Sequence, residues 1–392
     1  MKILILRTAA NKMNLATYNL QEVGLAKALV RKGHVCDVGY YCGRESDHKE
    51  TITFDENKTI DILWLHGKDI LREGIYPSLK KYVDGYDIIQ VGGYVGITSC
   101  WISRKYPQKI VNYQGPYFCE DNRGDIKKAA IFDKIVLPLQ HKKNMVVATK
   151  STLATDYVKS KGIGDVTTIG VGLDLENLTC STKDIQNNKF VKKIAKDRDG
   201  KVLLYIGVLE SRRNIPFLLE VFHKVNAQIP NCKLVIIGKG KPEYVEMCMK
   251  KIEDLGIKEN VIYKEQLEQK YMSAVYQLCD AFLLPTRYEI FGMVLLEAMY
   301  YGLPVFTTYN GGSSTLMNKD NGIIIDCMDV NEWSNRIVQI FSDEKKCKII
   351  GENAHATIKN NYTWDALADK FLDVYKKRLQ KRERKNYGIN KK

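Results

Sequence analysis

The sequence predicts a two-domain α/β protein in which each domain is built on a parallel, doubly wound sheet. Short apolar runs recur along the chain, separated by stretches long enough for helices or loops. This alternation stops in a polar, charged stretch near residues 175–201 and then restarts. The chain has 392 residues, whereas one hydrophobic core rarely exceeds about 250 to 300 residues. We therefore expect two similar α/β halves that face each other across a cleft.

The first half opens with a βαβ pattern. A buried strand at residues 2–6 is followed by a helix that ends at Lys32-Gly33 and by a strand at residues 35–41. Later apolar runs lie at residues 60–65, 88–91, 109–113, 145–149 and 166–171. Since the N-terminus reads as a strand and all apolar runs are far below the roughly 18 to 20 residues of a membrane span, we expect neither a signal peptide nor a spanning segment. The first domain is assigned to residues 1–178.

The second half repeats the pattern after a linker assigned to residues 179–200. Its expected strands lie at residues 202–207, 234–238, 261–263, 281–284, 305–308 and 322–325, with helical patterns between them. The second domain is therefore assigned to residues 201–362. Residues 363–392 form a final segment in which an amphipathic helix packs one face on a domain and a basic tail follows.

Charge and cysteine usage narrow the class of protein. Of the net charge of +14, the segment Lys376–Lys392 contributes +8, so the basicity belongs mostly to the tail. This tail either attracts the chain to anionic lipid or keeps it soluble. The ten cysteines are scattered without a CxxC pair, and no histidine has metal-ligand spacing. A reduced cytoplasmic location without a metal site is expected.

The most informative stretch is residues 283–305, where a predicted strand runs into a loop and a short helix. The loop carries Glu289 and ends at Gly292, where the backbone must approach another group closely. The helix, Met293 to Met299, is ended by residues 302–304, Gly-Leu-Pro. Its open start offers unpaired N–H groups and a positive dipole end, which together suit an anion such as a diphosphate.

Two glutamates of this stretch are placed to bracket a ligand. Glu297 lies one to two turns inside the helix, deeper than Glu289. Because carboxylates accept hydrogen bonds from vicinal hydroxyls, Glu297 is interpreted as a ribose ligand and Glu289 as a ligand of a transferred sugar. On spacing alone, the alternative of a surface glutamate before an ordinary helix and a second one in a salt bridge stays open.

Glu289 and Glu297 match the signature E-x-F-G-x4-E-A-M-x-x-G-x-P-V. In this motif the chain resembles the retaining glycosyltransferase family 4, also called group 1, whose two Rossmann-like domains form the GT-B fold. The resemblance extends to residues 205–214 and to Gly311-Gly312. It implies that a nucleotide sugar binds the C-terminal domain, that the acceptor binds the N-terminal domain, and that neither a metal nor a cofactor is needed.

The resemblance also assigns roles to single residues. Arg213 takes the position of the family's lysine and is expected in catalysis beside Glu289, whereas the family's preceding arginine falls on Val208 and Arg212 is the neighbouring replacement. Cationic side chains and the helix start would then stabilise charge on the leaving diphosphate. The other expected donor-binding residues are Gly207, Phe291, Gly292 and Met293, with Gln266 as a base contact unless it lies in an ordinary exposed loop.

Gln114 stands after the strand at residues 109–113, where many relatives have histidine. Since glutamine does not titrate near neutral pH, Gln114 is expected to position groups by hydrogen bonding and not to act as a general base. Without a protein base, front-face displacement fits the expected retention. In that mechanism the departing phosphate oxygen takes the acceptor proton.

The predicted function is transfer of a hexose, preferably from a UDP sugar, to a hydroxyl group in cell-surface polysaccharide (capsule or lipopolysaccharide) or lipid-linked oligosaccharide synthesis. A non-catalytic sugar-nucleotide-binding subunit is the alternative. A basic nucleic-acid-binding protein is a less favoured one, because the basic tail lacks interleaved aromatics apart from Tyr387, and nucleic acid is not an expected partner. Residues 126–137 mix apolar residues with lysines. They form either a cationic helix resting on anionic lipid at the inner face of the membrane or a core-facing helix with a wet basic face.

Overall fold

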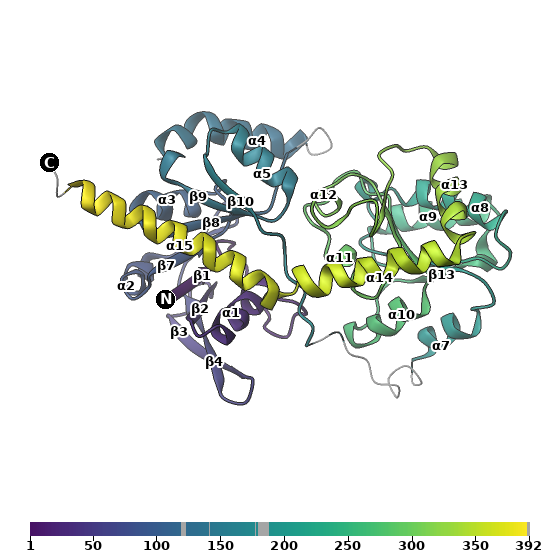
Figure 1. Cartoon of the computed structure of the whole chain (residues 1–392), viewed down its shortest axis with the longest axis horizontal. Coiled ribbons are helices and arrows are strands. Elements are labelled where there is room, and N and C mark those ends of the chain that lie inside the picture. The colour runs from purple at the N-terminus through teal and green to yellow at the C-terminus, as the bar shows by residue number, and fades with distance from the viewer. Residues whose placement is uncertain (119–122, 141, 177, 179–187, 390–392) are drawn as a thin grey trace. The chain divides into compact units, whose positions relative to one another are not determined.

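The computed structural model describes residues 1–118, 123–140, 142–176, 178 and 188–389, and the chain divides into two compact units (Figure 1). The first unit contains Met1–Gly172 together with Thr363–Lys392, and the second contains Leu173–Tyr362. The sequence prediction ended the first domain six residues later and kept residues 363–392 apart. In the structure this last segment is part of the first unit, because its helix packs there. Part of the predicted linker, residues 179–187, lies outside the described residues.

The first unit is built on an eight-stranded sheet in the order β10-β9-β8-β7-β1-β2-β4-β3. All neighbouring strands pair in parallel except β3 and β4. The strands are β1 (Lys2–Leu6), β2 (Val35–Tyr41), β3 (His48–Phe54), β4 (Lys58–Leu65), β7 (Ile88–Val91), β8 (Ile110–Gln114), β9 (Val146–Thr149) and β10 (Asp165–Thr168).

The expectation of a purely parallel sheet is wrong at one edge, where β3 runs antiparallel to β4. Five of the seven β3 residues are exposed, so the strand has no apolar run to reveal it. A tight connection at Asp55-Glu56, both with positive φ, returns the chain directly into β4. A small hairpin of β5 (Lys68–Ile70) and β6 (Glu73–Ile75) was also not predicted, since β5 is fully exposed.

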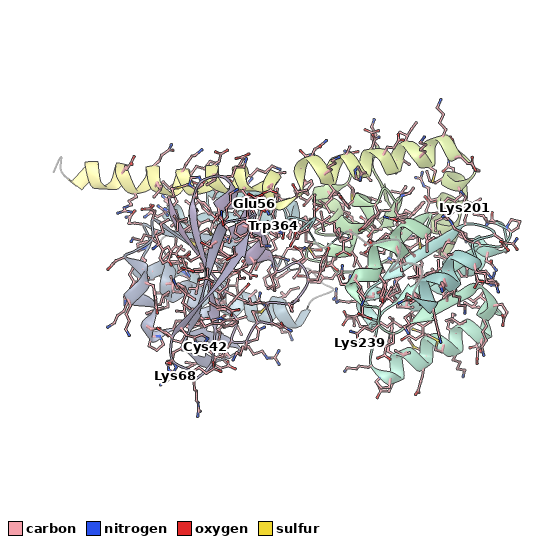
Figure 2. The ribbon with its side chains drawn as sticks, turned by 90° about the horizontal axis from the view of Figure 1, so that it is seen from below. Cys42, Glu56, Lys68, Lys201, Lys239 and Trp364 are labelled. Carbon is pink, nitrogen blue, oxygen red and sulfur yellow. The ribbon has the colours of Figure 1, made fainter. Side chains whose placement is uncertain are left out.

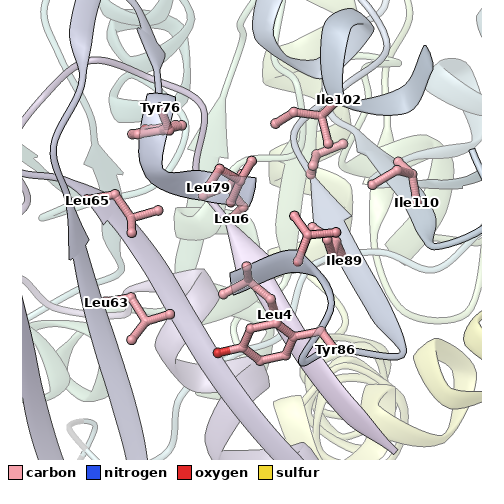
Figure 3. Packing of buried hydrophobic residues seen from close by; sticks show 12 residues of the cluster. Leu4, Leu6, Leu63, Leu65, Tyr76, Leu79, Tyr86, Ile89, Ile102 and Ile110 are labelled. Carbon is pink, nitrogen blue, oxygen red and sulfur yellow. The ribbon is translucent and has the colours of Figure 1, made fainter. Parts of the chain in front are cut away.

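Helices cover the first sheet, and apolar side chains fill the space between them. One core cluster joins Leu4 and Leu6 of β1 with Ile89 of β7, Ile102 of α3 and Ile110 of β8 (Figure 3). Burial of such side chains is the main stabilising contribution to the unit. The helices are α1 (Gln21–Arg31), η1 (Pro77–Leu79), α2 (Lys80–Val83), α3 (Ile97–Lys105), α4 (Arg123–Ile135), η3 (Leu137–Leu139), η4 (Lys142–Asn144), α5 (Thr152–Ser160) and α15 (Trp364–Ile389).

Trp364 fixes the start of α15 to the first unit and is marked in Figure 2. Its indole is 3% exposed and donates a hydrogen bond from Nε1 to Oδ1 of Asn19 at 3.1 Å. The ring fills the space that glycines leave: a Cβ on Gly24 or on Gly172 would lie 2.4 Å from it. These contacts join α15 to α1, which explains why the C-terminal helix belongs to the first unit.

The second unit contains a six-stranded parallel sheet in the order β13-β12-β11-β14-β15-β16. All six strands predicted for this half are confirmed. The strands are β11 (Val202–Ile206), β12 (Lys233–Ile237), β13 (Val261–Lys264), β14 (Ala281–Leu284), β15 (Val305–Thr307) and β16 (Ile323–Ile324). The helices are α7 (Lys189–Lys196), η5 (Ser211–Arg213), α8 (Ile215–Asn226), α9 (Pro242–Asp254), η6 (Lys258–Asn260), η7 (Gln269–Tyr271), α10 (Met272–Leu278), α11 (Met293–Tyr300), α12 (Ser313–Leu316), α13 (Val330–Phe341) and α14 (Glu344–Asn361).

Other sequence expectations concern the cysteines and membrane crossing. The eight cysteines in the described part of the chain are free thiols, and Cys119 and Cys180 lie outside it. Within the described residues, no helix has both the length and the apolar character that crossing a membrane requires.

Candidate active site

The candidate site lies at the carboxyl edge of the second sheet, where the strand order reverses. Strand β11 is central: it pairs with β12 on one side and with β14 on the other. The strands that precede β14 in the chain lie on the β12 side, so the loops after β11 and β14 diverge at this point. Such a switch point is where open parallel sheets bind ligands. The loop after β11 carries Arg212 and Arg213, and the loop after β14 carries Glu289.

The structure brings these three charged side chains together. Nη1 of Arg213 forms an ion pair with Oε2 of Glu289, and Nη1 of Arg212 lies 3.9 Å from the same oxygen. The side chains of Arg213 and Glu289 are each only 12% exposed, so water screens this pair weakly. Arg212 also contacts Oε1 of Glu210 through Nε at 2.7 Å. Two arginines and two glutamates therefore share a partly buried edge of the sheet.

Backbone hydrogen bonds hold the two loops in register. Nη1 of Arg212 donates to the Tyr288 carbonyl at 2.8 Å, and the Arg287 N–H donates to the Arg212 carbonyl at 2.9 Å. The buried Thr286 hydroxyl lies within 3.2 Å of the Arg212 carbonyl and 3.0 Å of the Tyr288 carbonyl. The arginines and Glu289 are thus fixed by main-chain contacts and not only by their own charges.

Gly292 occupies the N-cap of α11 with φ of 78°, a conformation that favours glycine. No side chain caps this helix start, as the sequence predicted. A Cβ at this position would lie 3.1 Å from Cγ of Glu289. Phe291 before it is 3% exposed and anchors the loop, and Met293 after it is partly exposed at the first turn. The positive end of the helix dipole therefore begins next to the charged cluster.

Two glycines support the loop from below. A Cβ on Gly311 would lie 2.0 Å from the Ile290 carbonyl oxygen, and a Cβ on Gly312 would lie 1.9 Å from the Phe291 carbonyl oxygen. The Gly311 N–H donates to the Glu289 carbonyl at 3.0 Å. Only glycine allows this approach of two backbones, which gives a physical reason for the Gly-Gly pair in the sequence.

Glu297 lies in the second turn of α11 and is 5% exposed. Its Oε2 accepts a hydrogen bond from the Tyr276 hydroxyl of α10 at 2.7 Å. Tyr276 in turn stacks on Tyr301 with ring centroids 5.1 Å apart. The carboxylate is therefore held by an aromatic pair in this structure, and its contact with a ribose stays a prediction.

The remaining donor-side residues lie along the same edge. Gly207 follows β11 with φ of 158°, and a Cβ there would lie 2.9 Å from the Tyr205 hydroxyl. Gln266 is exposed in the loop after β13, which agrees both with an ordinary exposed loop and with a base contact. The sequence favours a strand-end turn at Gly238-Lys239-Gly240 after β12, but this run stays extended, because Gly240 forms a parallel bridge with Leu209. Its Lys239, marked in Figure 2, is exposed.

Gln114 belongs to the first unit and ends β8 at the carboxyl edge of that sheet. It is 1% exposed, and both ends of its amide are in use. Oε1 accepts from the Tyr94 N–H at 3.1 Å, and Nε2 donates to the Pro116 carbonyl at 2.7 Å. Gln114 therefore ties the loop after β7 to the loop after β8. This arrangement agrees with a positioning residue.

Sequence reasoning missed two cations at the same edge of the first sheet. Arg7 follows β1 and pairs with Glu22 at 3.0 Å. Lys150 follows β9, donates to Oε1 of Gln21 at 2.8 Å and lies 5.1 Å from the centre of the Tyr113 ring. Burial lowers the pKa of Lys150, and the Glu22 charge opposes that shift. The positions of the two cations in the sequence could have indicated them, since each directly follows a predicted buried strand.

Comparison with known proteins places the fold and then the family. The GT-B fold is confirmed by solved structures. Sucrose-phosphate synthase from Thermosynechococcus elongatus has a TM-score of 0.71 at 18% identity, and the superposition covers 96% of this chain and 99% of that protein's chain. The Anabaena protein HepE, solved in complex with UDP, has a TM-score of 0.69 at 16% identity over 96% of this chain and 100% of its own.

The family follows from the second unit. Residues 186–357 match the family model described as glycosyl transferases group 1. An uncharacterized glycosyltransferase of Methanocaldococcus jannaschii is 29% identical over 190 residues, which cover 48% of this chain and 47% of that protein. The chain spans about half the length of the curated relatives it matches. The second unit is thus similar to group 1 glycosyltransferases, in agreement with the resemblance predicted from the motif of the two glutamates.

Proposed function

We propose that the chain is a retaining hexosyltransferase that moves a hexose from a nucleotide diphosphate sugar to an acceptor hydroxyl, with UDP sugars preferred. The observation that carries this proposal is the pair of Arg213 and Glu289 beside the N-terminus of α11, which has no side-chain cap. Two arginines next to a helix N-terminus suit a diphosphate, and the Glu289 carboxylate, three residues before Gly292, suits a sugar hydroxyl. The family match supports the same chemistry.

Donor binding would rearrange this cluster in a simple way. Diphosphate oxygens would take the place of Glu289 as partner of Arg213, and Arg212 is close enough to join them. The Glu289 carboxylate would then accept hydrogen bonds from the hexose. The ion pair thus holds both side chains in place before the donor binds, which lowers the cost of organising the site.

The proposed reaction occurs on one face of the sugar. The bond between the anomeric carbon and the phosphate oxygen breaks, the acceptor oxygen forms the new bond on the same face, and the acceptor proton passes to the departing phosphate. Arg213, Arg212 and the α11 N-terminus would stabilise the negative charge on the leaving group, so that the step is proposed to proceed without a metal. Gln114 would take no proton, because an amide does not titrate near neutral pH.

The donor can be identified by thermal unfolding against UDP, GDP and ADP sugars. HepE was solved with UDP, and this chain shares its fold, which supports UDP as the first choice. A donor present at 100 times its dissociation constant should add roughly 2.7 kcal/mol to the free energy of unfolding. Equal shifts with all three nucleotides, or no shift, would contradict the preference for UDP.

Turnover assays on variants distinguish an enzyme from a sugar-nucleotide-binding subunit. Glu289→Gln keeps the size of the side chain and removes the charge that we assign to the hexose. It should abolish hexose transfer while donor protection against unfolding is kept. Glu332→Gln, at an exposed pair with Arg336, is the matched control and should transfer normally. Wild-type protein that binds donor but transfers nothing to any hydroxyl acceptor would favour the binding subunit.

We also propose a peripheral location on the inner face of the membrane, with a polysaccharide or lipid-linked acceptor. Helix α4 buries one face yet leaves Ile131 and Ile135 each 62% exposed, and Leu139 after it is 57% exposed. Lys127 and Lys134 are exposed on the same helix. Apolar side chains flanked by cations suit the boundary of an anionic bilayer.

Vesicle flotation tests this location. The chain should float with vesicles that contain anionic lipid, and the double substitution Ile131→Ser with Ile135→Ser should reduce the floating fraction several-fold. Ile349→Ser on α14 removes an apolar side chain that is 46% exposed elsewhere and serves as the control. Equal flotation of both variants would argue against α4 as the contact.

A further inference from the structure

A small cavity with two buried polar groups in its lining lies at the amino edge of the first sheet, opposite to the edge that carries Gln114. Its volume is about 20 Å³, enough for one water-sized particle. It is enclosed by the end of α3, the starts of β8 and β9, the residue after η3 and the middle of α15. The lining residues are Ser103, Arg104, Pro107, Ile110, Asn112, Gln140, Asn144, Met145 and Arg378.

Arg378 enters this cavity from α15 and is 3% exposed. One guanidinium nitrogen, Nη1, donates to the Asn144 carbonyl at 2.5 Å. Within the described part of the chain, Nε of Arg378 is buried and has no hydrogen-bond partner, and the same holds for Oγ of Ser103. Two buried donors that line one cavity and lack partners are unusual, because a buried polar group that forms no hydrogen bond destabilises the fold.

The charge of Arg378 also lacks a direct counter-charge among the described residues. The carboxylate that acts on it is Asp165, which is itself held by Nζ of Lys381 at 2.7 Å. The cavity lining contains a second guanidinium, Arg104, and no carboxylate. Burial lowers the pKa of Arg378, because the charged form is poorly solvated there. Because Asp165 is shared with Lys381, an anion beside this buried cation would be favourable.

We propose that this cavity binds one small inorganic anion of the size of chloride, held by Nε of Arg378 and Oγ of Ser103. A water molecule would satisfy the two donors but would leave the guanidinium without a counter-charge in direct contact, whereas an anion would supply both. The cavity volume favours a monatomic ion over phosphate. The bound ion joins α3 to α15 and to the segment before β9, so it fastens the C-terminal helix to the first sheet.

The first experiment locates the ion directly. Crystals of the full chain are soaked in sodium bromide and diffraction is measured at the bromine absorption edge. We expect an anomalous peak between Arg378 and Ser103. An ordered water at this position with no anomalous signal would overturn the proposal, and so would an anomalous peak only at exposed lysines.

The second experiment measures thermal unfolding of the full chain while sodium gluconate is replaced by sodium chloride, bromide or phosphate at constant ionic strength. Chloride and bromide should give a saturable rise in Tm of about 2–4 °C, and phosphate should not. Ser103→Ala should lose most of this rise and still fold, because it removes only one hydroxyl. Arg378→Gln should lose all of it.

Arg382→Gln is the matched control on the same helix and should keep the anion-dependent rise, since Arg382 does not line the cavity. If Arg378→Gln fails to fold, the Ser103→Ala comparison decides alone. A Tm that responds to chloride equally in wild type and Ser103→Ala overturns the proposal, and so does a larger response to phosphate than to chloride.

Discussion

The carboxyl edges of the two sheets differ in how their polar groups are satisfied. In the second unit, Arg213 and Glu289 face each other as charged groups at the switch point of the sheet. In the first unit, the neutral Gln114 is 1% exposed, and both ends of its side-chain amide form hydrogen bonds with backbone groups. The switch point of the second sheet therefore presents an ion pair that a charged ligand could displace, whereas Gln114 in the first unit belongs to a closed hydrogen-bond network. An ion pair can be displaced by a charged donor, whereas the Gln114 network is suited to shaping loops.

The substitution with the largest expected effect on this contrast removes the cation Arg213. Arg213→Met deletes the group that we assign to the leaving diphosphate, and kcat should fall about 10²- to 10³-fold. Steady-state turnover with the identified donor measures the effect. Arg336→Met, at an exposed pair, is the control. A fall of less than threefold would remove Arg213 from the mechanism.

The next effect concerns the glycine that supports the Glu289 loop. Gly311→Ala places a methyl group where only 2.0 Å separates it from the Ile290 carbonyl oxygen, so the loop must shift. We expect kcat to fall about tenfold to 10²-fold and the free energy of unfolding to fall by about 1–3 kcal/mol. A Cβ on Gly164 meets nothing within 4 Å, so Gly164→Ala is the control for both measurements. Unchanged turnover in Gly311→Ala would show that the loop tolerates displacement.

The carboxyl edge of the first sheet should respond differently to substitution. Gln114→Ala leaves the Tyr94 N–H and the Pro116 carbonyl without this partner, so it should destabilise the protein by about 1–3 kcal/mol. Because Gln114 is assigned a positioning role, kcat should fall by no more than about tenfold. Denaturant unfolding and turnover separate the two effects. Loss of turnover to background with intact donor binding would instead assign Gln114 to catalysis.

The smallest expected effect is a pH dependence at Lys150. Burial lowers the pKa of Lys150 in the folded state, so the folded protein binds fewer protons than the unfolded chain between the lowered pKa and the ordinary lysine value. The contribution of Lys150 to the free energy of unfolding therefore rises as the pH increases from the lowered pKa to the ordinary lysine value. Relative to wild type, Lys150→Met should be most favourable at neutral pH and lose that advantage toward pH values of about 10.

The measurement is the difference in free energy of unfolding between the two proteins across this range. Lys143→Met changes an exposed lysine and should run parallel to wild type. A Lys150→Met difference that does not vary with pH would show that the charged form is not penalised in the folded state.

Much of the donor edge was predictable because its parts are local. The strand β14, the loop with Glu289, Gly292 and the start of α11 are consecutive, so spacing alone places them together. Glu297 shows the limit of this approach. Its spacing predicts the correct helix, but its contact with Tyr276 depends on how α10 packs against α11.

The sequence by itself determined the parallel strands and helices, since each is encoded by a run of apolar residues with its own period. It also determined the open start of α11, because Gly292 and the absence of a capping side chain are written in neighbouring positions. Only the tertiary structure decided that α15 belongs to the first unit, that β3 is antiparallel and that Arg378 is buried. Periodicity specifies which face of an element avoids water, but the partner of that face is chosen by packing between distant segments.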